Sequence, residues 1–376
     1  MVTAAYDPAS LYKLLITVVM GMVLFLAMSG VLRDLHLSIR ARWPVAIAAG
    51  ALLAFNVVLG ERIFGAKNWI SIGPLSFQPS ELVKIAFILA GAATLDRLFA
   101  KRNLVFTILF SAYCVGCLAL MSDFGTALIF FVAFLCIAFL RTGDLPSIAM
   151  MVAAAAFGCG IILRFKPYIA DRFAAWRHAW DYAQDIGYQQ TRTMSAMASG
   201  GVVGVGPKDG WLKYVGAANT DLVFGVVGEE FGFLLALCCV AALVIPIVFT
   251  LRCAAAARSS FYTILSCATA AMLVCQMALN VLGAVDLLPL TGVTFPFVSM
   301  GGSSMISCWG LMAYLKAADT RQNASFALRL SKLAPQRRGK KASPAPKARP
   351  KAPQEGFFAD RPDIPVDKIF GKEEDK

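Results

Sequence analysis

Apolar stretches long enough to cross a lipid bilayer recur along most of this 376-residue chain. A spanning helix needs about 20 mostly apolar residues, because the hydrocarbon core of a bilayer is about 30 Å thick. About nine segments meet this requirement, and they predict an all-α, polytopic membrane bundle. The segments are residues 12–32, 43–60, 79–98, 104–121, 124–141, 147–164, 223–250, 261–285 and 297–317.

The composition agrees with membrane embedding and argues against a soluble domain. The chain is 58% hydrophobic and 15% charged, with a mean hydropathy of +0.67, whereas soluble domains are about one quarter charged. The ten cysteines lie in or beside the apolar segments, where free cysteine is a common small buried residue. Cys114 and Cys117 have the spacing of a redox or zinc motif, but no second pair and no histidine lies nearby. We therefore favour buried free thiols.

Positive charge falls in alternate connections between the apolar segments, and this pattern predicts the orientation. Cytoplasmic loops carry an excess of Lys and Arg. The basic residues of these connections are Arg33, Arg40, Arg42, Arg97, Lys101, Arg102, Arg141, Arg252 and Arg258. We expect these connections and the C-terminus to be cytoplasmic. Residues 165–222 then form one long extracytoplasmic loop.

The last part of the chain has a different composition from the rest. Residues 335–353 are rich in Lys, Arg, Pro and Ala, and such a stretch cannot bury enough apolar surface to fold alone. We predict a membrane domain over residues 1–317. A basic, largely disordered cytoplasmic tail over residues 318–376 follows it and can contact anionic lipid or a cytoplasmic partner.

Asp221 is the most informative ionisable residue of the chain. It lies where the long loop meets the next span, after a glycine-rich stretch and before Glu229 and Glu230. Ionisable groups at apolar spans are costly and usually serve a function. Partial desolvation would raise the pKa of this carboxylate into a range useful for a general base. The alternative is that Asp221 caps the helix that follows.

A second polar group opens the span at residues 79–98. Pro79 suits the first position of a helix, and Glu81 in the first turn suits the helix dipole. Capping does not explain Lys84, which lies one turn deeper. Glu81 and Lys84 are three residues apart on one helix face. We expect them to line the same outer-facing cavity as Asp221; the alternative is a purely structural ion pair of Lys84 with Glu81 or Glu230.

Two other patterns have simpler interpretations. Asp123 precedes the span at residues 124–141, where an N-cap is the ordinary role of Asp. The glycine-rich stretch at residues 200–206 resembles a phosphate loop only superficially, because no Gly-Lys-Ser/Thr follows it. Basic and aromatic residues mix in the long loop. They fit either a loop that lies on lipid headgroups or one that receives an anionic lipid headgroup.

Several of these motifs, in this order, resemble the SEDS family of bacterial cell-wall polymerases, which includes RodA, FtsW and SpoVE. The resemblance covers roughly residues 60–317. Its most specific parts are Gln78-Pro79-Ser80-Glu81, Asp123-Phe124-Gly125-Thr126, Thr220-Asp221 with Gly228-Glu229-Glu230, and Pro296 through Ser304.

The resemblance implies a peptidoglycan glycosyltransferase of the bacterial cytoplasmic (inner) membrane, with its active face extracytoplasmic, that serves cell elongation or division. Such an enzyme joins lipid II disaccharides into glycan strands and releases undecaprenyl diphosphate. The implied partners are lipid II, the undecaprenyl-diphosphate-linked glycan, a class B penicillin-binding protein (a transpeptidase) and membrane lipids, with no nucleic acid. A divalent cation, Mg²⁺ or Mn²⁺, is a candidate cofactor.

The resemblance also assigns candidate roles to residues of this chain. The Asp that matches Asp221 is the proposed catalytic residue of the family. Cations near it would stabilise the departing diphosphate, and the candidates are Arg172, Arg177, Arg192, Lys67 and Lys84. The candidate substrate-binding residues are Lys67, Trp69, Gln78, Glu81, Lys84, Asp123, Arg172, Gln189, Arg192, Ser195, Thr220, Glu229, Glu230, Ser303 and Ser304.

The chain departs from the family pattern at three points. Asn219 stands where the family usually has His, Met300 stands where it usually has Tyr, and nine spans are predicted where the family has ten. Two other functions stay open, namely a flippase for a lipid-linked precursor and a non-catalytic scaffold for a penicillin-binding protein. Crowding of polar groups on one face, without an internal repeat, favours the enzyme over the transporter.

The predicted orientation can be checked by cysteine labelling in intact cells. In a background without the native cysteines, Lys340→Cys should resist a membrane-impermeant maleimide until the cells are opened, because the tail is predicted to be cytoplasmic. Lys208→Cys in the long loop serves as the control and should react in intact cells. Labelling of Lys340→Cys from outside would refute the orientation.

Overall fold

The computed structural model describes residues 8–63, 65–72, 75–93, 101–165, 167–254 and 259–317. The chain divides into one unit over Met1–Ala327 and a second over Leu328–Lys376. The predicted tail, residues 318–376, lies outside the described residues, so its disorder and its cytoplasmic location stay predictions.

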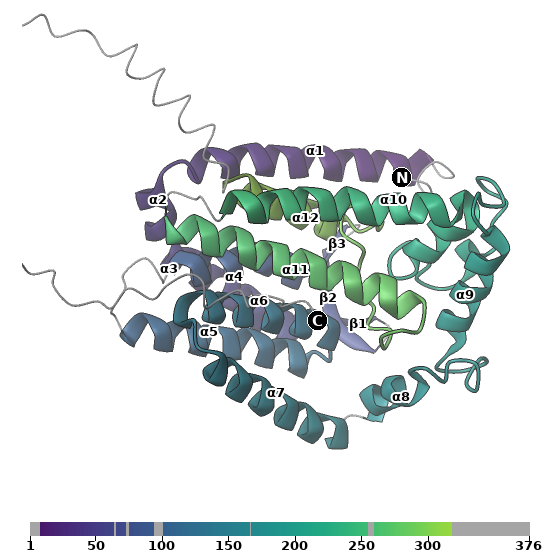
Figure 1. The fold of residues 1–376 in the computed structure, drawn as a ribbon, viewed down its shortest axis with the longest axis horizontal. Coiled ribbons are helices and arrows are strands. Elements are labelled where there is room, and N and C mark those ends of the chain that lie inside the picture. Colours follow the sequence, from purple (N-terminus) through teal and green to yellow (C-terminus); the bar gives the residue numbers. More distant parts are fainter. Residues whose placement is uncertain are drawn as a thin grey trace, which may run out of the picture. The chain divides into compact units, whose positions relative to one another are not determined.

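A long helix lies at each of the nine predicted spans, which confirms a polytopic helical bundle (Figure 1). In the described part of the chain these helices are α1 (Pro8–Val31), α3 (Arg42–Leu59), α4 (Pro79–Ala93), α5 (Lys101–Leu120), α6 (Phe124–Thr142), α7 (Leu145–Phe165), α10 (Val223–Ala254), α11 (Ser260–Ala284) and α12 (Gly302–Ala317).

The helices differ in how well they would tolerate lipid. Within the described residues, α1, α3, α6, α10 and α11 are long and apolar enough to cross a membrane, and α5 and α7 contain shorter apolar helices. Most side chains of α4 and α12 are buried by their neighbours, so these two helices can carry polar groups. Large apolar side chains such as Leu26, Val58 and Phe157 are exposed, as expected for a surface that faces lipid.

Helix α11 is central to the packing. It contacts α4, α6, α10 and α12, while α12 also lies along α1. Aromatic side chains fill this core, and Phe87, Phe130, Phe261 and Tyr314 are almost fully buried. The aromatic rings of Phe87 and Phe130 lie 4.9 Å apart between their centroids, a separation typical of favourable ring contacts.

A small antiparallel sheet is the one departure from the predicted all-helical fold in the described residues. Its strands β1 (Glu61–Ile63), β2 (Ala66–Ile72) and β3 (Leu75–Phe77) are ordered β1-β2-β3. The register pairs Glu61 with Trp69 and Ile70 with Phe77. Gly65, at a φ of 88°, makes the turn between β1 and β2, a backbone conformation that glycine adopts at little cost.

Much of the predicted long loop is folded. It contains α8 (Pro167–Ala175), α9 (Tyr188–Gly200) and the short 3₁₀ helix η2 (Leu212–Tyr214). Helix α9 packs against α10 and α11. Figure 1 shows α8 and α9 at the end of the bundle opposite α2 (Leu35–Arg40), which lies in the basic first connection. The basic first connection and the folded long loop therefore lie at opposite ends of the bundle.

The glycine-rich stretch supplies hydrogen-bond donors at a break in α10. Gly232 has non-helical torsions (φ 82°, ψ 166°) and interrupts the helix. The carbonyl oxygen of Glu229 accepts a hydrogen bond from the backbone N–H of Val205 at 2.9 Å, and that of Glu230 accepts one from Gly206 at 3.1 Å. Broken helices survive in an apolar setting when the freed backbone groups find such partners. This structural role accounts for the glycines.

The packing of α9 against α10 predicts the effect of one glycine substitution. A Cβ added at Gly200 would lie 2.6 Å from the Cα of Glu229. Backbone there cannot yield easily, so Gly200→Ala should lower the free energy of unfolding by about 1–3 kcal/mol, the usual cost of overpacking. Thermal unfolding in detergent measures the effect.

Gly158→Ala is the matched control. Gly158 lies inside α7, and an added Cβ would meet nothing within 4 Å. Alanine is the better helix former by about 0.5–1 kcal/mol, so this variant should unfold at the same or a higher temperature. Equal unfolding temperatures for the two variants would contradict the close contact of α9 with α10.

Candidate functional site

Asp221 lies at a cavity of about 390 Å³ at the end of the bundle that carries α8 and α9. The walls come from α8, from the start of α9 and the two residues before Gly187, from Asp221 shortly before α10, and from the connection between α11 and α12. The lining residues are Asp171, Arg172, Ala175, Asp185, Ile186, Tyr188, Gln189, Gln190, Asp221, Leu290 and Gly292. Carboxylates, amides and one guanidinium thus face a space large enough for part of a sugar-sized ligand.

The backbone around Asp221 is held from two sides. Its N–H donates to the carbonyl oxygen of Ala217 at 2.9 Å. Its own carbonyl oxygen accepts from Nδ2 of Asn280, on α11, at 2.8 Å. A Cβ added at Gly292 would lie 3.3 Å from Oδ2 of Asp221, so the carboxylate rests against this glycine. Gly292 has a φ of 71°, which suits glycine.

The surroundings of Asp221 raise the pKa of its carboxyl group above the ordinary value of 3.8. Desolvation by burial is the largest cause, and the negative charge of Asp123 adds to it. The hydrogen bond with Thr220 and the positive charge of Arg172 oppose the rise. Nη1 of Arg172 also donates to the carbonyl oxygen of Leu290 at 2.6 Å, which fixes this cation in the cavity wall. The site therefore combines a more basic carboxylate with a held positive charge.

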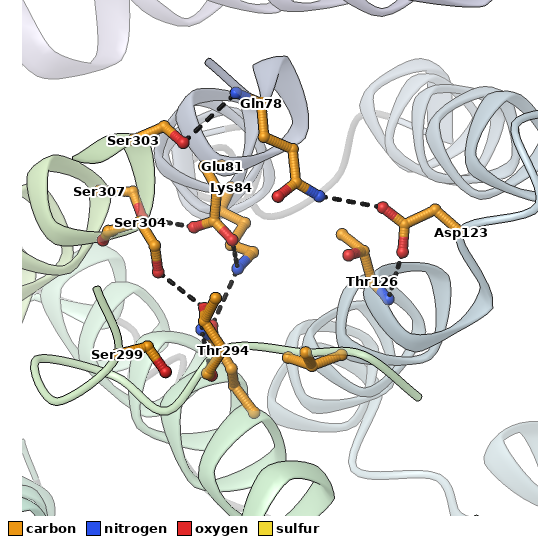
Figure 2. A network of polar contacts seen from close by, with 12 residues as sticks. Gln78, Glu81, Lys84, Asp123, Thr126, Thr294, Ser299, Ser303, Ser304 and Ser307 are labelled. Carbon is orange, nitrogen blue, oxygen red and sulfur yellow. Dashed lines mark hydrogen bonds and ion pairs between the residues drawn. The ribbon is translucent and has the colours of Figure 1, made fainter. Parts of the chain in front are cut away.

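Asp123 is a connector at the head of α6. Its Oδ1 accepts from the backbone N–H of Thr126 at 3.2 Å, which is the expected N-cap. Its Oδ2 accepts from Nδ2 of Asn68 at 2.8 Å and from Nε2 of Gln78 at 3.1 Å. The backbone N–H of Gln78 donates to Oγ of Ser303 at 3.3 Å. Figure 2 shows how Gln78 reaches toward Asp123 while its backbone faces Ser303.

Glu81 and Lys84 form a buried ion pair, with Nζ of Lys84 2.8 Å from Oε1 of Glu81. Nζ also donates to Oε1 of Gln276 at 2.9 Å, and Oε2 of Glu81 accepts from Ser307 at 2.7 Å. Lys84 is 0% exposed, and neither member of the pair lines the described cavity. The expectation that both line the cavity of Asp221 is therefore wrong. Neighbouring helices cover this face of α4, which the sequence of α4 alone does not reveal.

The network continues from this pair to the connection between α11 and α12. Nε2 of Gln276 donates to both Oγ1 and the carbonyl oxygen of Thr294, each at 3.0 Å. Oγ1 of Thr294 also shares a hydrogen bond of 2.8 Å with Oγ of Ser304 (Figure 2). Thr294 is two residues from Gly292, so the network ends close to the cavity.

Of the other candidate residues, three lie on or beside the cavity. Gln189 lines it and donates through Nε2 to the carbonyl oxygen of Gly216 at 3.1 Å. The guanidinium of Arg192 lies 5.1 Å from the ring centroid of Tyr188, a cation–π contact. The carbonyl oxygen of Thr220 accepts from Oγ of Ser299.

The remaining candidates lie elsewhere. Nζ of Lys67 donates to the carbonyl oxygens of Val57 and Val58, at the end of α3. The carboxylate of Glu229 accepts from the backbone N–H groups of Trp211 and Leu212. Three more residues lie outside the cavity lining, namely Trp69 on β2, Ser195 further along α9 and Glu230 buried in α10. Lys67 and Glu229 thus bind backbone in this structure.

Some residues that build the site were not singled out from the sequence as site residues. These are Asn68, Gln190, Gln276, Asn280, Ser299 and Ser307. The sequence did carry a signal for two of them, because Gln276 and Asn280 stand four residues apart in an apolar span and so share one helix face.

A protein-only metal site is not apparent in the part of the chain that the structure describes. No three His, Cys, Asp or Glu side chains there are grouped so that they could hold a metal ion. The ten cysteines are free thiols. Cys114, Cys117 and Cys308 are buried, five others are partly buried, and Cys159 and Cys238 are exposed, so the expected burial holds for only part of them.

The fold and these buried polar groups define a polytopic, helical integral membrane protein. The sequence profile of the FtsW/RodA/SpoVE family, described as cell cycle protein, matches residues 4–324. The chain belongs to this family.

Individual relatives and solved structures agree with the family. The chain is 30% identical over 272 residues to the probable peptidoglycan glycosyltransferase FtsW of Borreliella burgdorferi, covering 70% of this chain and 74% of that protein. It is 30% identical over 336 residues to the peptidoglycan glycosyltransferase RodA of Mycobacterium leprae, covering 84% of this chain and 70% of that protein.

Two solved structures share the fold. One is a chain from a study of how a peptidoglycan synthase complex coordinates polymerization and crosslinking, with a TM-score of 0.69, 27% identity and coverage of 85% of this chain and 91% of that one. The other is the rod shape determining protein RodA of Thermus thermophilus, with a TM-score of 0.61, 25% identity and coverage of 83% and 87%.

The buried pair of Glu81 and Lys84 predicts a non-additive effect on stability. Lys84→Met leaves the carboxylate of Glu81 buried without its cation, a change that typically costs about 3–5 kcal/mol. Adding Glu81→Gln removes the unpaired charge, so the double variant should unfold at a higher temperature than Lys84→Met alone. Thermal unfolding in detergent tests this. A double variant that unfolds no later than Lys84→Met would show that the pair is not the source of the loss.

Proposed function

We propose that this chain is a peptidoglycan glycosyltransferase that joins lipid II disaccharides into glycan strands and releases undecaprenyl diphosphate. The observation that carries the proposal is the cavity that holds Asp221 and Arg172 together. Membership of a family whose relatives are named peptidoglycan glycosyltransferases supports it. The apolar helices and the polar cavity also match a substrate with a polyprenyl tail and a sugar headgroup.

The carboxylate of Asp221 suits the role of general base. The acceptor is a sugar hydroxyl, which is a weak nucleophile until a base removes its proton. The raised pKa of Asp221 makes its carboxylate a stronger base than an ordinary Asp. Asp221 accepts the proton as the hydroxyl oxygen attacks the anomeric carbon of the donor, and the bond from that carbon to the diphosphate oxygen breaks. The negative charge leaves with the diphosphate.

Arg172 is placed to stabilise the departing diphosphate. Its guanidinium lines the cavity of Asp221 and is held by the carbonyl oxygen of Leu290. A fixed cation stabilises charge that develops in the transition state without a cost of reorganisation. Arg192, beside the cavity-lining Tyr188, can extend the positive surface. Two of the other candidate cations, Lys67 and Lys84, donate to groups within the protein.

A divalent cation would depend on the substrate for ligands. The described residues hold no cluster that fits a metal ion by itself, so Mg²⁺ or Mn²⁺ would need oxygens of the lipid diphosphate.

The proposal extends to location and partner. We propose that the cavity faces the extracytoplasmic side of the bacterial inner membrane, where lipid II would be polymerised, and the charge pattern of the connections supports this side. A class B penicillin-binding protein would cross-link the new strand, and the likeness to a chain of a peptidoglycan synthase complex supports this partner. Flippase and scaffold functions are less well supported, because a general base beside a fixed cation serves chemistry rather than passage or docking.

Asp221→Asn provides the test. The amide keeps the size of the side chain but cannot take a proton, so lipid II polymerisation by the purified protein should fall about a hundredfold or more. The unfolding temperature should stay close to that of the wild type. Asp34→Asn is the matched control. Asp34 caps α2 by accepting from the backbone N–H groups of His36 and Leu37, so this substitution should leave the rate unchanged. Near wild-type polymerisation by Asp221→Asn would exclude the general-base role.

A further inference from the structure

Two amide side chains of α11, Gln276 and Asn280, are buried and directed at backbone rather than at the cavity. They are 0% and 1% exposed, and neither lines the cavity. A buried amide is costly unless it is hydrogen-bonded. Nδ2 of Asn280 donates to the carbonyl oxygen of Val293 at 2.7 Å, and Nε2 of Gln276 donates to that of Thr294 at 3.0 Å. Two successive residues of the irregular connection are thus bound to successive turns of one helix.

Asn280 also joins this connection to the residue at the cavity. The same Nδ2 donates to the carbonyl oxygen of Asp221 at 2.8 Å. One amide nitrogen therefore binds the backbone of Asp221 and of Val293 together. Gly292, which precedes Val293, touches the carboxylate of Asp221. A shift of either backbone segment would move the carboxylate relative to the cavity wall.

The orientation of Gln276 is set by its other partner. Lys84 carries an ammonium group, which can donate but cannot accept. Because Nζ of Lys84 donates to Oε1 of Gln276, the Nε2 end of the amide must face Thr294. Glu81 holds Lys84 in place. The buried pair of Glu81 and Lys84 therefore acts on the cavity indirectly, by orienting Gln276.

We infer that Asn280 and Gln276 are positioning residues that hold the backbone of Asp221 and of Val293–Thr294 in the geometry required for proton transfer, with Lys84 orienting Gln276. The inference rests on the proposed function, because it assigns these residues to the reaction at Asp221. A displacement of about 1 Å at a reacting group can cost a hundredfold in rate. The amides therefore affect catalysis without touching substrate.

The test uses the full chain in detergent with lipid II as substrate. Asn280→Leu keeps much of the volume and removes both donated hydrogen bonds, so kcat should fall at least tenfold. KM should stay within about twofold of the wild type, because Asn280 does not line the cavity. Gln276→Met is a second variant that removes the bonds to Thr294 and should lower kcat in the same direction. Asn280→Gln retains an amide donor and should recover part of the rate.

A matched control comes from the same helix. Thr269 is fully buried, and its hydroxyl donates to the carbonyl oxygen of Leu265 within α11. Thr269→Val removes a buried hydrogen bond that does not reach Asp221. Unfolding temperatures of all variants separate a general loss of stability from a specific loss of rate.

The pKa of Asp221 gives a readout that does not depend on activity. Infrared titration follows this pKa through the carboxyl band of Asp221. The band is assigned by comparing each protein with the same protein that also carries Asp221→Asn, in which the band is absent. Desolvation is the main cause of the raised pKa, so a carboxylate freed by Asn280→Leu should gain water and titrate at lower pH. The acid limb of kcat should move to lower pH with it. The other charged groups facing Asp221 are unchanged in these variants; they are Arg172 on α8, Asp123 before α6, and Asp171 and Asp185 in the cavity wall.

The outcomes separate the inference from the proposed function. Unchanged kcat and unchanged titration of Asp221 in a folded Asn280→Leu protein would overturn the inference while leaving the proposed function intact. A loss of rate that matches that of Thr269→Val, with the titration unmoved, would also overturn it, since the role would be structural only. A wild-type protein that makes no glycan would contradict the proposed function. The infrared titration would still decide whether Asn280 holds Asp221.

Discussion

Backbone N–H and C=O groups that leave a helix inside an apolar bundle must find new partners, and this requirement shapes the cavity end of the protein. The connection between α11 and α12 is irregular, so side chains supply what a helix would have supplied. Asn280 binds the carbonyl oxygen of Val293, Gln276 binds that of Thr294, and Ser299 accepts from the N–H of Phe295. The break at Gly232 is satisfied in a different way, by backbone groups of the glycine-rich stretch.

These hydrogen bonds set the positions of the charged groups at the cavity. The irregular connection contributes Leu290 and Gly292 to the wall. If this connection were a regular helix, its side chains would keep its backbone farther from Asp221. Leu290 holds Arg172 through its carbonyl oxygen, and Gly292 leaves room for the carboxylate of Asp221. Burial then raises the pKa of Asp221. The stable bundle and the reactive carboxylate are therefore linked through the same few backbone contacts.

The parts of the fold that follow from bilayer thickness were predictable from the sequence, and the parts that depend on distant neighbours were not. Runs of about 20 apolar residues predict helices such as α6 and α11 because lipid permits few alternatives. The sheet was missed because β1 and β3 have three residues each. The place of Asp221 at the end of the long loop made it a candidate from the sequence. The position of Lys84, in contrast, depends on Gln276, 192 residues away, and spacing within α4 cannot reveal such a contact.

Polymerisation of lipid II by the purified chain tests the central claim most directly, with and without a class B penicillin-binding protein whose transpeptidase site has been inactivated. The account predicts glycan strands that lengthen with time, with release of undecaprenyl diphosphate in proportion, whenever this chain is present. The partner alone should give none. Movement of lipid II across vesicles by this chain, with no glycan formed in either mixture, would contradict the account and favour a transporter.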